Sequence, residues 1–165
     1  MQTSVATLQV SRDFGVPVEA LYAHWTSPET RVRWEAAPDT GMRYDAFDTR
    51  PGGVETVRVL HDGAEVGHLV QTHHRIEEDS LLASSMVGVF GGHSTMMTAR
   101  VVEFSATDQG SRSDAVAQAC DFTGRDIGAV QEAGWTWILD RFQADLDAAT
   151  AKADGSGSAV IPAPL

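Results

Sequence analysis

The stretch that decides the fold is EAGWTWILDRFQADL, residues 132–146. Its apolar side chains recur every three or four positions, which is the period of a helix with one buried face. The same spacing extends on both sides, so we expect a helix from about Asp126 to Thr150. A helix that is long and apolar on one face needs a large apolar surface to cover it.

The chain before this helix supplies that surface as strands. Residues 3–14 alternate between apolar and polar side chains, which predicts a first strand. Two short helices are expected next, one after Pro17 and one after Ser27-Pro28, because proline favours the first helical turn. Turn-forming residues then separate six further runs. The expected strands are Met42–Asp48, Val54–His61, Ala64–Ile76, Ser80–Phe90, Ser94–Ser105 and Ser111–Ala119.

Connections this short join antiparallel neighbours. The sequence therefore predicts the α+β class: a curved seven-stranded antiparallel sheet wrapped around a long C-terminal helix, with two short helices after strand 1. We expect a single domain over residues 1–150. A flexible tail is expected over residues 151–165, where Gly, Ser, Ala and Pro occur without a period.

Charge and composition exclude several classes of protein. Twelve Lys and Arg stand against 23 Asp and Glu, a net charge of −11, with no basic stripe for nucleic acid or an anionic membrane surface. No apolar run is long enough to cross a bilayer. The single cysteine, Cys120, allows no disulfide within the chain, and the first residues lack the pattern of a secretion signal. We therefore expect a cytoplasmic protein.

Three stretches carry a resemblance to a known family: FGVPVEALYAHWTSPETRVRW (14–34), YDAFDTRPGG (44–53) and GWTWILDRFQADL (134–146). Together they resemble the SRPBCC superfamily (START-like, birch-pollen-allergen or helix-grip fold), in the branch of the C-terminal domain of the heat-shock-protein ATPase activator. The similarity extends from residue 3 to about 148. Two positions depart from it: Phe142 stands where leucine is usual, and Met86 where an aromatic residue is usual.

The strand Ser111–Ala119 suggests a cavity beside the long helix. Every second residue from Ser113 to Ala119 is small, and if these side chains face the helix they leave space that bulky groups do not fill. Closer packing of the helix, with Trp135 filling the gap, is the alternative. The expected cavity residues are Trp34, Met86, Phe90, Met96, Ala115, Ala117, Trp135, Ile138, Leu139 and Phe142.

Four residues are candidates for acid–base chemistry: His68, His74, His93 and Arg100. His68 and His74 share strand parity with Val66 and Val70, which predicts that both rings point inward, about 20 Å apart. They are too far apart to share a metal, so we expect no metal site. Arg100 is also expected to point inward, where it would anchor a ligand carboxylate or phenolate. The alternatives are that its side chain extends to the rim of the sheet or pairs with a local carboxylate.

The sequence has no nucleophile, phosphate-loop or dinucleotide motif, so we expect no cofactor. The leading hypothesis is a protein that binds a hydrophobic, aromatic or polycyclic small molecule, as a carrier or for sequestration and self-resistance in secondary metabolism. A polyketide cyclase or aromatase that uses the same cavity is an alternative. The resemblance also implies a third possibility, an interaction domain for a chaperone ATPase. The oligomeric state stays open.

Overall fold

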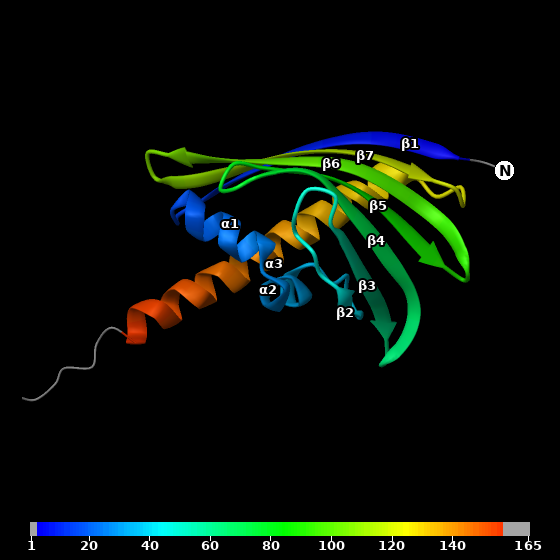
Figure 1. Ribbon diagram of the computed structural model, residues 1–165, viewed down its shortest axis with the longest axis horizontal. Helices are drawn as coiled ribbons and strands as arrows, with labels where there is room; N and C mark the ends of the chain where they lie inside the picture. Colours follow the sequence, from blue (N-terminus) through cyan, green and yellow to red (C-terminus); the bar gives the residue numbers. More distant parts are fainter. Residues whose placement is uncertain (1–2, 157–165) are drawn as a thin grey trace, which may run out of the picture.

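The structure, a computed structural model, describes residues 3–156 and has the expected α+β helix-grip architecture. Figure 1 shows the sheet curving over one long helix, with two short helices on the same concave side. The elements in chain order are β1 (Ser4–Phe14), α1 (Val18–Thr26), α2 (Pro28–Trp34), β2 (Gly41–Ala46), β3 (Val54–His61), β4 (Ala64–Glu77), β5 (Leu81–Phe90), β6 (His93–Thr107), β7 (Gly110–Asp121) and α3 (Ile127–Ser156).

The sheet has seven antiparallel strands in the order β1-β7-β6-β5-β4-β3-β2. Strands β2 to β7 are therefore a meander, and β1 closes the sheet against β7. The turn between β3 and β4 is the one that the sequence indicates most strongly. Asp62 and Gly63 have φ angles of 49° and 77°, the left-handed conformation that a two-residue hairpin turn requires at both positions.

The long helix α3 packs mainly against β1, β7 and α2. Its apolar stripe meets the alternating small residues of β7, which point inward as the sequence predicts. The core is completed by α1 and α2, whose aromatic residues pack onto the same helix. The largest buried side chains include Leu21, Trp34, Val102, Ile127, Leu139 and Phe142.

The inward face of β4 differs from the expectation. Val66 is 44% exposed, whereas Gln71 and His73 are only 4% and 3% exposed. The residues at odd positions from Gly67 to His73 therefore face inward, and the expected inward orientation of both His68 and His74 is wrong. Because Val66 and Val70 are apolar, the sequence predicts that the even-numbered positions face inward. Gln71 and His73 are buried instead, because their polar partner Glu55 lies on β3, and the sequence of β4 alone does not indicate it.

The end of α3 also differs from the expectation. The helix continues to Ser156, past the expected end at Thr150, so the first residues of the expected tail are helical. Residues 157–165, the remainder of that tail, lie outside the described residues.

Candidate functional site

A cavity of about 270 Å³ lies between the concave face of the sheet and α3 and is partly open to solvent. Strands β2 to β6 supply most of the floor, α3 covers it, and the loop between α2 and β2 adds one wall. The apolar lining residues are Ala37, Met42, Val59, Leu69, Met86, Phe90, Met96, Gly134, Trp135 and Ile138. The polar lining residues are Glu35, Thr40, Thr98, Arg100, Arg125 and Gln131.

The cavity exists because α3 packs closely on only one part of the concave face, the part formed by β1 and β7. Ala115 and Ala117 on β7 are 5% and 2% exposed and belong to the core, so the helix comes close there. The space opens instead over the neighbouring strands, beside Leu69 on β4 and Met86 on β5. The helix adds to it at Gly134, where a β-carbon would meet no atom within 4 Å.

The structure separates the expected cavity residues into two groups. Met86, Phe90, Met96, Trp135 and Ile138 line the cavity. The others lie in the packed core outside it: Trp34, Ala115, Ala117, Leu139 and Phe142.

An aromatic cluster explains why Trp34 and Phe142 belong to the core. The ring of Phe142 lies 5.0 Å from those of both Trp25 and Trp34, and the two tryptophan rings are 5.2 Å apart. Rings at these separations fill the space between α1, α2 and α3. The cavity is thus confined to the other half of the concave face.

None of the three candidate histidines lines the cavity. His74 is exposed on the outer face, where its Nε2 lies 2.8 Å from the hydroxyl of Ser85. His68 is half-buried at the rim of a separate surface depression, and His93 is exposed at the start of β6. The structure does not bring these three residues together with Arg100.

Arg100 does face the cavity, as its parity on β6 predicts. Its Nε donates to Ser84 Oγ at 3.2 Å, and its Nη2 donates to Gln71 Oε1. Its Nη1 lies 3.7 Å from Glu35 Oε1, beyond hydrogen-bond distance. Burial lowers the pKa of Arg100, and the carboxylate of Glu35 opposes that shift. The guanidinium stays charged, because arginine does not deprotonate in proteins.

A buried network of charges lies behind Arg100. The carboxylate of Glu55 is fully buried and accepts hydrogen bonds from Arg31 Nη1 at 2.6 Å and Gln71 Nε2 at 3.1 Å, and its Oε1 lies 2.7 Å from His73 Nε2. Burial alone would raise the pKa of Glu55, but the bond with His73 and the charge of Arg31 outweigh it and lower the pKa to about 2.

Glu35 links this network to the cavity. Its Oε2 accepts hydrogen bonds from Arg31 Nε at 2.9 Å and from the Tyr44 hydroxyl at 3.1 Å. Burial, with the nearby carboxylate of Glu35, raises the pKa of Tyr44, so this hydroxyl stays protonated. The guanidinium carbon of Arg31 also lies 5.5 Å and 5.6 Å from the ring centres of Tyr44 and Phe47, within the range of a cation–π contact.

The RPGG turn (residues 50–53) helps to position the buried network. Gly52 N donates to the carbonyl oxygen of His73 at 2.8 Å, and His73 N donates to that of Gly53 at 3.0 Å. A β-carbon at Gly53 would collide with the carbonyl oxygen of Asp48, so only glycine fits there. The turn, which ends two residues before Glu55, thereby fixes the start of β3 against β4.

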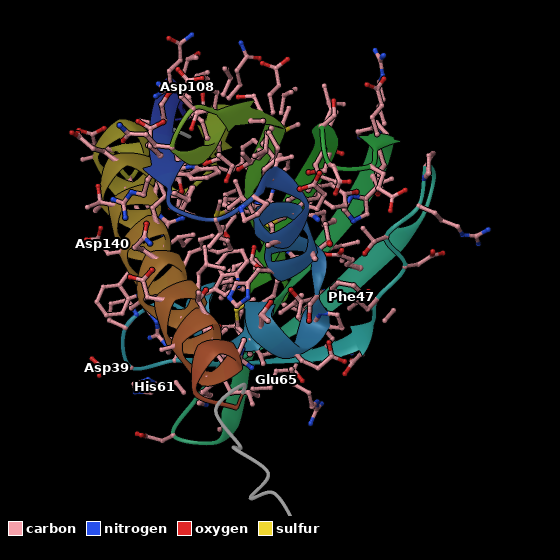
Figure 2. All side chains as sticks on the ribbon, turned by 90° about the vertical axis from the view of Figure 1, so that its left-hand side faces the viewer. Asp39, Phe47, His61, Glu65, Asp108 and Asp140 are labelled. Atoms are coloured by element: carbon pink, nitrogen blue, oxygen red, sulfur yellow. The ribbon has the colours of Figure 1, made fainter. Side chains whose placement is uncertain are left out.

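The loop that forms one wall of the cavity is held at two points. The indole Nε1 of Trp137 donates to the carbonyl oxygen of Ala36 at 2.9 Å, which fastens the loop to α3. His61 Nδ1 lies 3.0 Å from the carbonyl oxygen of Asp39, and Figure 2 shows these two residues side by side. Glu35, Ala37 and Thr40 are therefore set in place around the cavity.

Sequence reasoning missed the polar residues of this region: Arg31, Glu35, Glu55, Gln71, His73 and Thr98. One signal was present on β3, where Glu55 shares parity with Val57 and Val59. A charged residue on an apolar strand face indicates a buried partner, but it does not say which residue that partner is.

A curved antiparallel sheet that grips a C-terminal helix, with a cavity between them, defines the helix-grip class of the SRPBCC superfamily. The family is identified by a sequence model described as "Activator of Hsp90 ATPase homolog 1-like protein", which matches residues 15–147. The chain belongs to this family.

Solved structures share the fold at low sequence identity. An uncharacterized protein from Rhizobium leguminosarum is 22% identical, covers 88% of this chain and 97% of its own, and has a TM-score of 0.75. Mll3558 from Rhizobium loti is 22% identical over 88% of this chain and 99% of its own, with a TM-score of 0.77. Ara h 8.0201 is 14% identical with the same coverage and a TM-score of 0.67. A search of the curated proteins finds no significant match.

The fold is one that commonly binds ligands, and the similarities to solved structures establish the fold alone. Within residues 3–156, no helix is long and apolar enough to cross a membrane.

Proposed function

We propose that the protein binds a hydrophobic, aromatic small molecule in the cavity between the sheet and α3. The observation that carries this proposal is the lining itself. Trp135 and Phe90 offer aromatic surfaces, Met86 and Met96 offer flexible thioethers, and two charged groups, Arg100 and Glu35, lie 3.7 Å apart in the lining. Pockets that combine apolar walls with a few placed polar groups are typical of small-molecule sites.

The volume of the cavity supports a ligand with one aromatic ring or two fused rings. A buried cavity of about 150 Å³ holds benzene, and pockets for drug-sized ligands begin at about 300 Å³. A cavity of about 270 Å³ falls between these sizes. A larger polycyclic ligand would extend through the open side of the cavity into solvent.

A carrier or sequestering role fits this site better than catalysis, and self-resistance in secondary metabolism is one form of it. A cyclase-like enzyme would need a group that exchanges protons with the bound molecule. The three candidate histidines lie away from the cavity, and Arg100 does not release its proton. Glu35 would be the remaining acid–base group, and Arg31 and Tyr44 already hold its carboxylate.

The family's description supports a second candidate function, contact with a chaperone of the Hsp90 class. This function would use an outer surface rather than the cavity. Stimulation of the chaperone's ATPase by the protein would support it, and stimulation that survives blocking of the cavity would separate it from ligand binding.

A variant that fills the cavity tests the proposal. Gly134→Leu places a side chain in the space where a β-carbon would meet no atom, whereas Ala133→Leu adds the same bulk at an exposed position of α3. We would titrate both variants and the wild type with naphthalene, 2-naphthol and 1-hydroxyanthraquinone and follow tryptophan fluorescence. We expect binding to the wild type and to Ala133→Leu, with affinity at least about tenfold weaker in Gly134→Leu. Absence of binding across this panel, or equal binding by Gly134→Leu, would contradict the proposal.

A further inference from the structure

The hydroxyl of Thr98 is buried and finds no hydrogen-bond partner among residues 3–156. Thr98 is 4% exposed and lines the cavity from β6, between Met86 on β5 and Ala119 on β7. A buried hydroxyl without a partner is costly, so such groups are rare in folded proteins. Apolar or small neighbours on both adjacent strands offer it nothing to bond.

Arg100 provides a second incomplete group two residues further along the same face of β6. Its Nε and Nη2 donate to the neutral groups of Ser84 and Gln71, but the described residues give its Nη1 no hydrogen bond. The contrast with Arg31 is clear, because the guanidinium of Arg31 meets carboxylate oxygens of Glu55 and Glu35 at 2.6 Å and 2.8 Å. The charge of Arg100 is therefore the less compensated of the two buried arginines.

Glu35 supplies an acceptor at the same end of the cavity. Its Oε1 accepts one hydrogen bond, from Arg31 Nη2 at 3.1 Å, and lies 3.7 Å from Arg100 Nη1. A carboxylate oxygen can accept a further hydrogen bond. The end of the cavity thus offers donors from Arg100, an acceptor on Glu35, and a hydroxyl on Thr98 that can do either.

We propose that this end of the cavity is an anchor for a neutral phenol or enol hydroxyl on the aromatic ligand. This inference rests on the proposed function and narrows its ligand class. Such a hydroxyl accepts hydrogen bonds from Arg100 and Thr98 and donates one to Glu35. A single ligand hydroxyl would therefore supply a hydrogen-bond partner to all three groups. A ligand carboxylate fits less well, because it would lie beside the carboxylate of Glu35.

The test compares matched ligands near neutral pH. We would measure the affinity of the wild type for 2-naphthol, naphthalene, 2-methoxynaphthalene and 2-naphthoate by titration calorimetry. We expect 2-naphthol to bind about tenfold more tightly than naphthalene or the methyl ether, and more tightly than 2-naphthoate. The methyl ether can accept but cannot donate, so it tests the role of Glu35 directly.

Variants at Thr98 test the anchor without disturbing the ion pairs. Thr98→Val keeps the shape and removes the hydroxyl, and Thr98→Ser keeps the hydroxyl. We expect Thr98→Val to weaken 2-naphthol binding about threefold to tenfold, and so to reduce the preference for 2-naphthol over naphthalene. Thr98→Ser should keep the preference for 2-naphthol. A thermal melt of the free protein checks that Thr98→Val is folded.

The outcomes separate the anchor from cavity binding itself. If 2-naphthol and naphthalene bind equally and Gly134→Leu weakens both, cavity binding stands and the anchor is wrong. Preference for 2-naphthoate would overturn the anchor too, because the site would then select an anion. If a folded Thr98→Val protein keeps the full preference for 2-naphthol, the proposed role of Thr98 in the anchor is wrong. If none of the four compounds binds, the proposed function fails together with the anchor.

Discussion

Arg31 on α2 and Glu55 on β3 are an ion pair that solvent scarcely reaches. The guanidinium Nη1 lies 2.6 Å from the carboxylate Oε2, and the two side chains are 6% and 0% exposed. The same carboxylate contacts Gln71 and His73 on β4. One acidic residue therefore ties a helix to two strands, directly behind the polar end of the cavity.

Replacing Glu55 with glutamine should strongly destabilise the fold. The amide of Glu55→Gln cannot neutralise Arg31, and removing one partner of a buried pair leaves an uncompensated charge. We expect a loss of about 3–5 kcal/mol in the free energy of unfolding, measured by urea denaturation.

The same substitution at Glu65 is the matched control. Glu65 pairs with Arg58 at 2.7 Å but is 43% exposed, and Figure 2 shows it on the lower side of the molecule. Glu65→Gln should cost less than about 1 kcal/mol, because exposed pairs contribute little. Equal losses at both positions would mean that burial does not set the cost of breaking the pair.

Acid should remove the stabilisation that Glu55 provides. The pKa of Glu55 is about 2 in the folded protein, below its ordinary value of 4.5, so the folded state favours the ionised form. The contribution, about 3 kcal/mol, is complete above pH 4.5 and is lost as the pH falls from there to about 2. The free energy of unfolding should therefore fall across this range. The fall should be smaller in Glu55→Gln, and an identical pH profile in both proteins would contradict the assignment.

Phe142 should be among the most costly core positions to truncate. Its ring is fully buried and contacts Phe14, His24, Trp25 and Trp34 at centroid distances of 5.0–5.4 Å. We expect Phe142→Ala to cost about 3–5 kcal/mol by urea denaturation, because it leaves a cavity among rigid rings. Phe142→Leu keeps more of the apolar volume and should cost clearly less. A larger loss for leucine than for alanine would show that the rings do not hold the site open.

The sequence predicted the parts of the fold that depend on local patterns. The inward direction of Ala115 and Ala117 and of Arg100 followed from alternation along β7 and β6. On β4 the same rule was wrong, because Gln71 and His73 are buried by partners on another strand. From sequence alone a polar residue is predicted to be exposed, unless its partner elsewhere in the chain is known. The β-bulge between His73 and Arg75 further shifts the register there.

The position of the cavity could not be predicted from residue sizes. Small residues on β7 suggested space beneath the helix, but α3 packs onto Ala115 and Ala117 and closes that space. The cavity opens where the curvature of the sheet carries Leu69 and Met86 away from the helix. The distance between α3 and these strands depends on how α3 packs on β1, β7 and α2. It cannot be predicted from the spacing of residues along the chain.

Gly134 lowers the stability of α3 and leaves space beside the cavity, so Gly134→Ala should stabilise the protein. Glycine within a helix costs up to about 1 kcal/mol relative to alanine, and an added β-carbon at Gly134 meets no atom within 4 Å. We expect the Tm to rise by roughly 2–4 °C in a thermal melt. Gly53→Ala is the opposite control, because its β-carbon would collide with the carbonyl oxygen of Asp48 and lower the Tm. A lower Tm in Gly134→Ala would mean that α3 packs more tightly over the cavity, which would leave less room for a ligand.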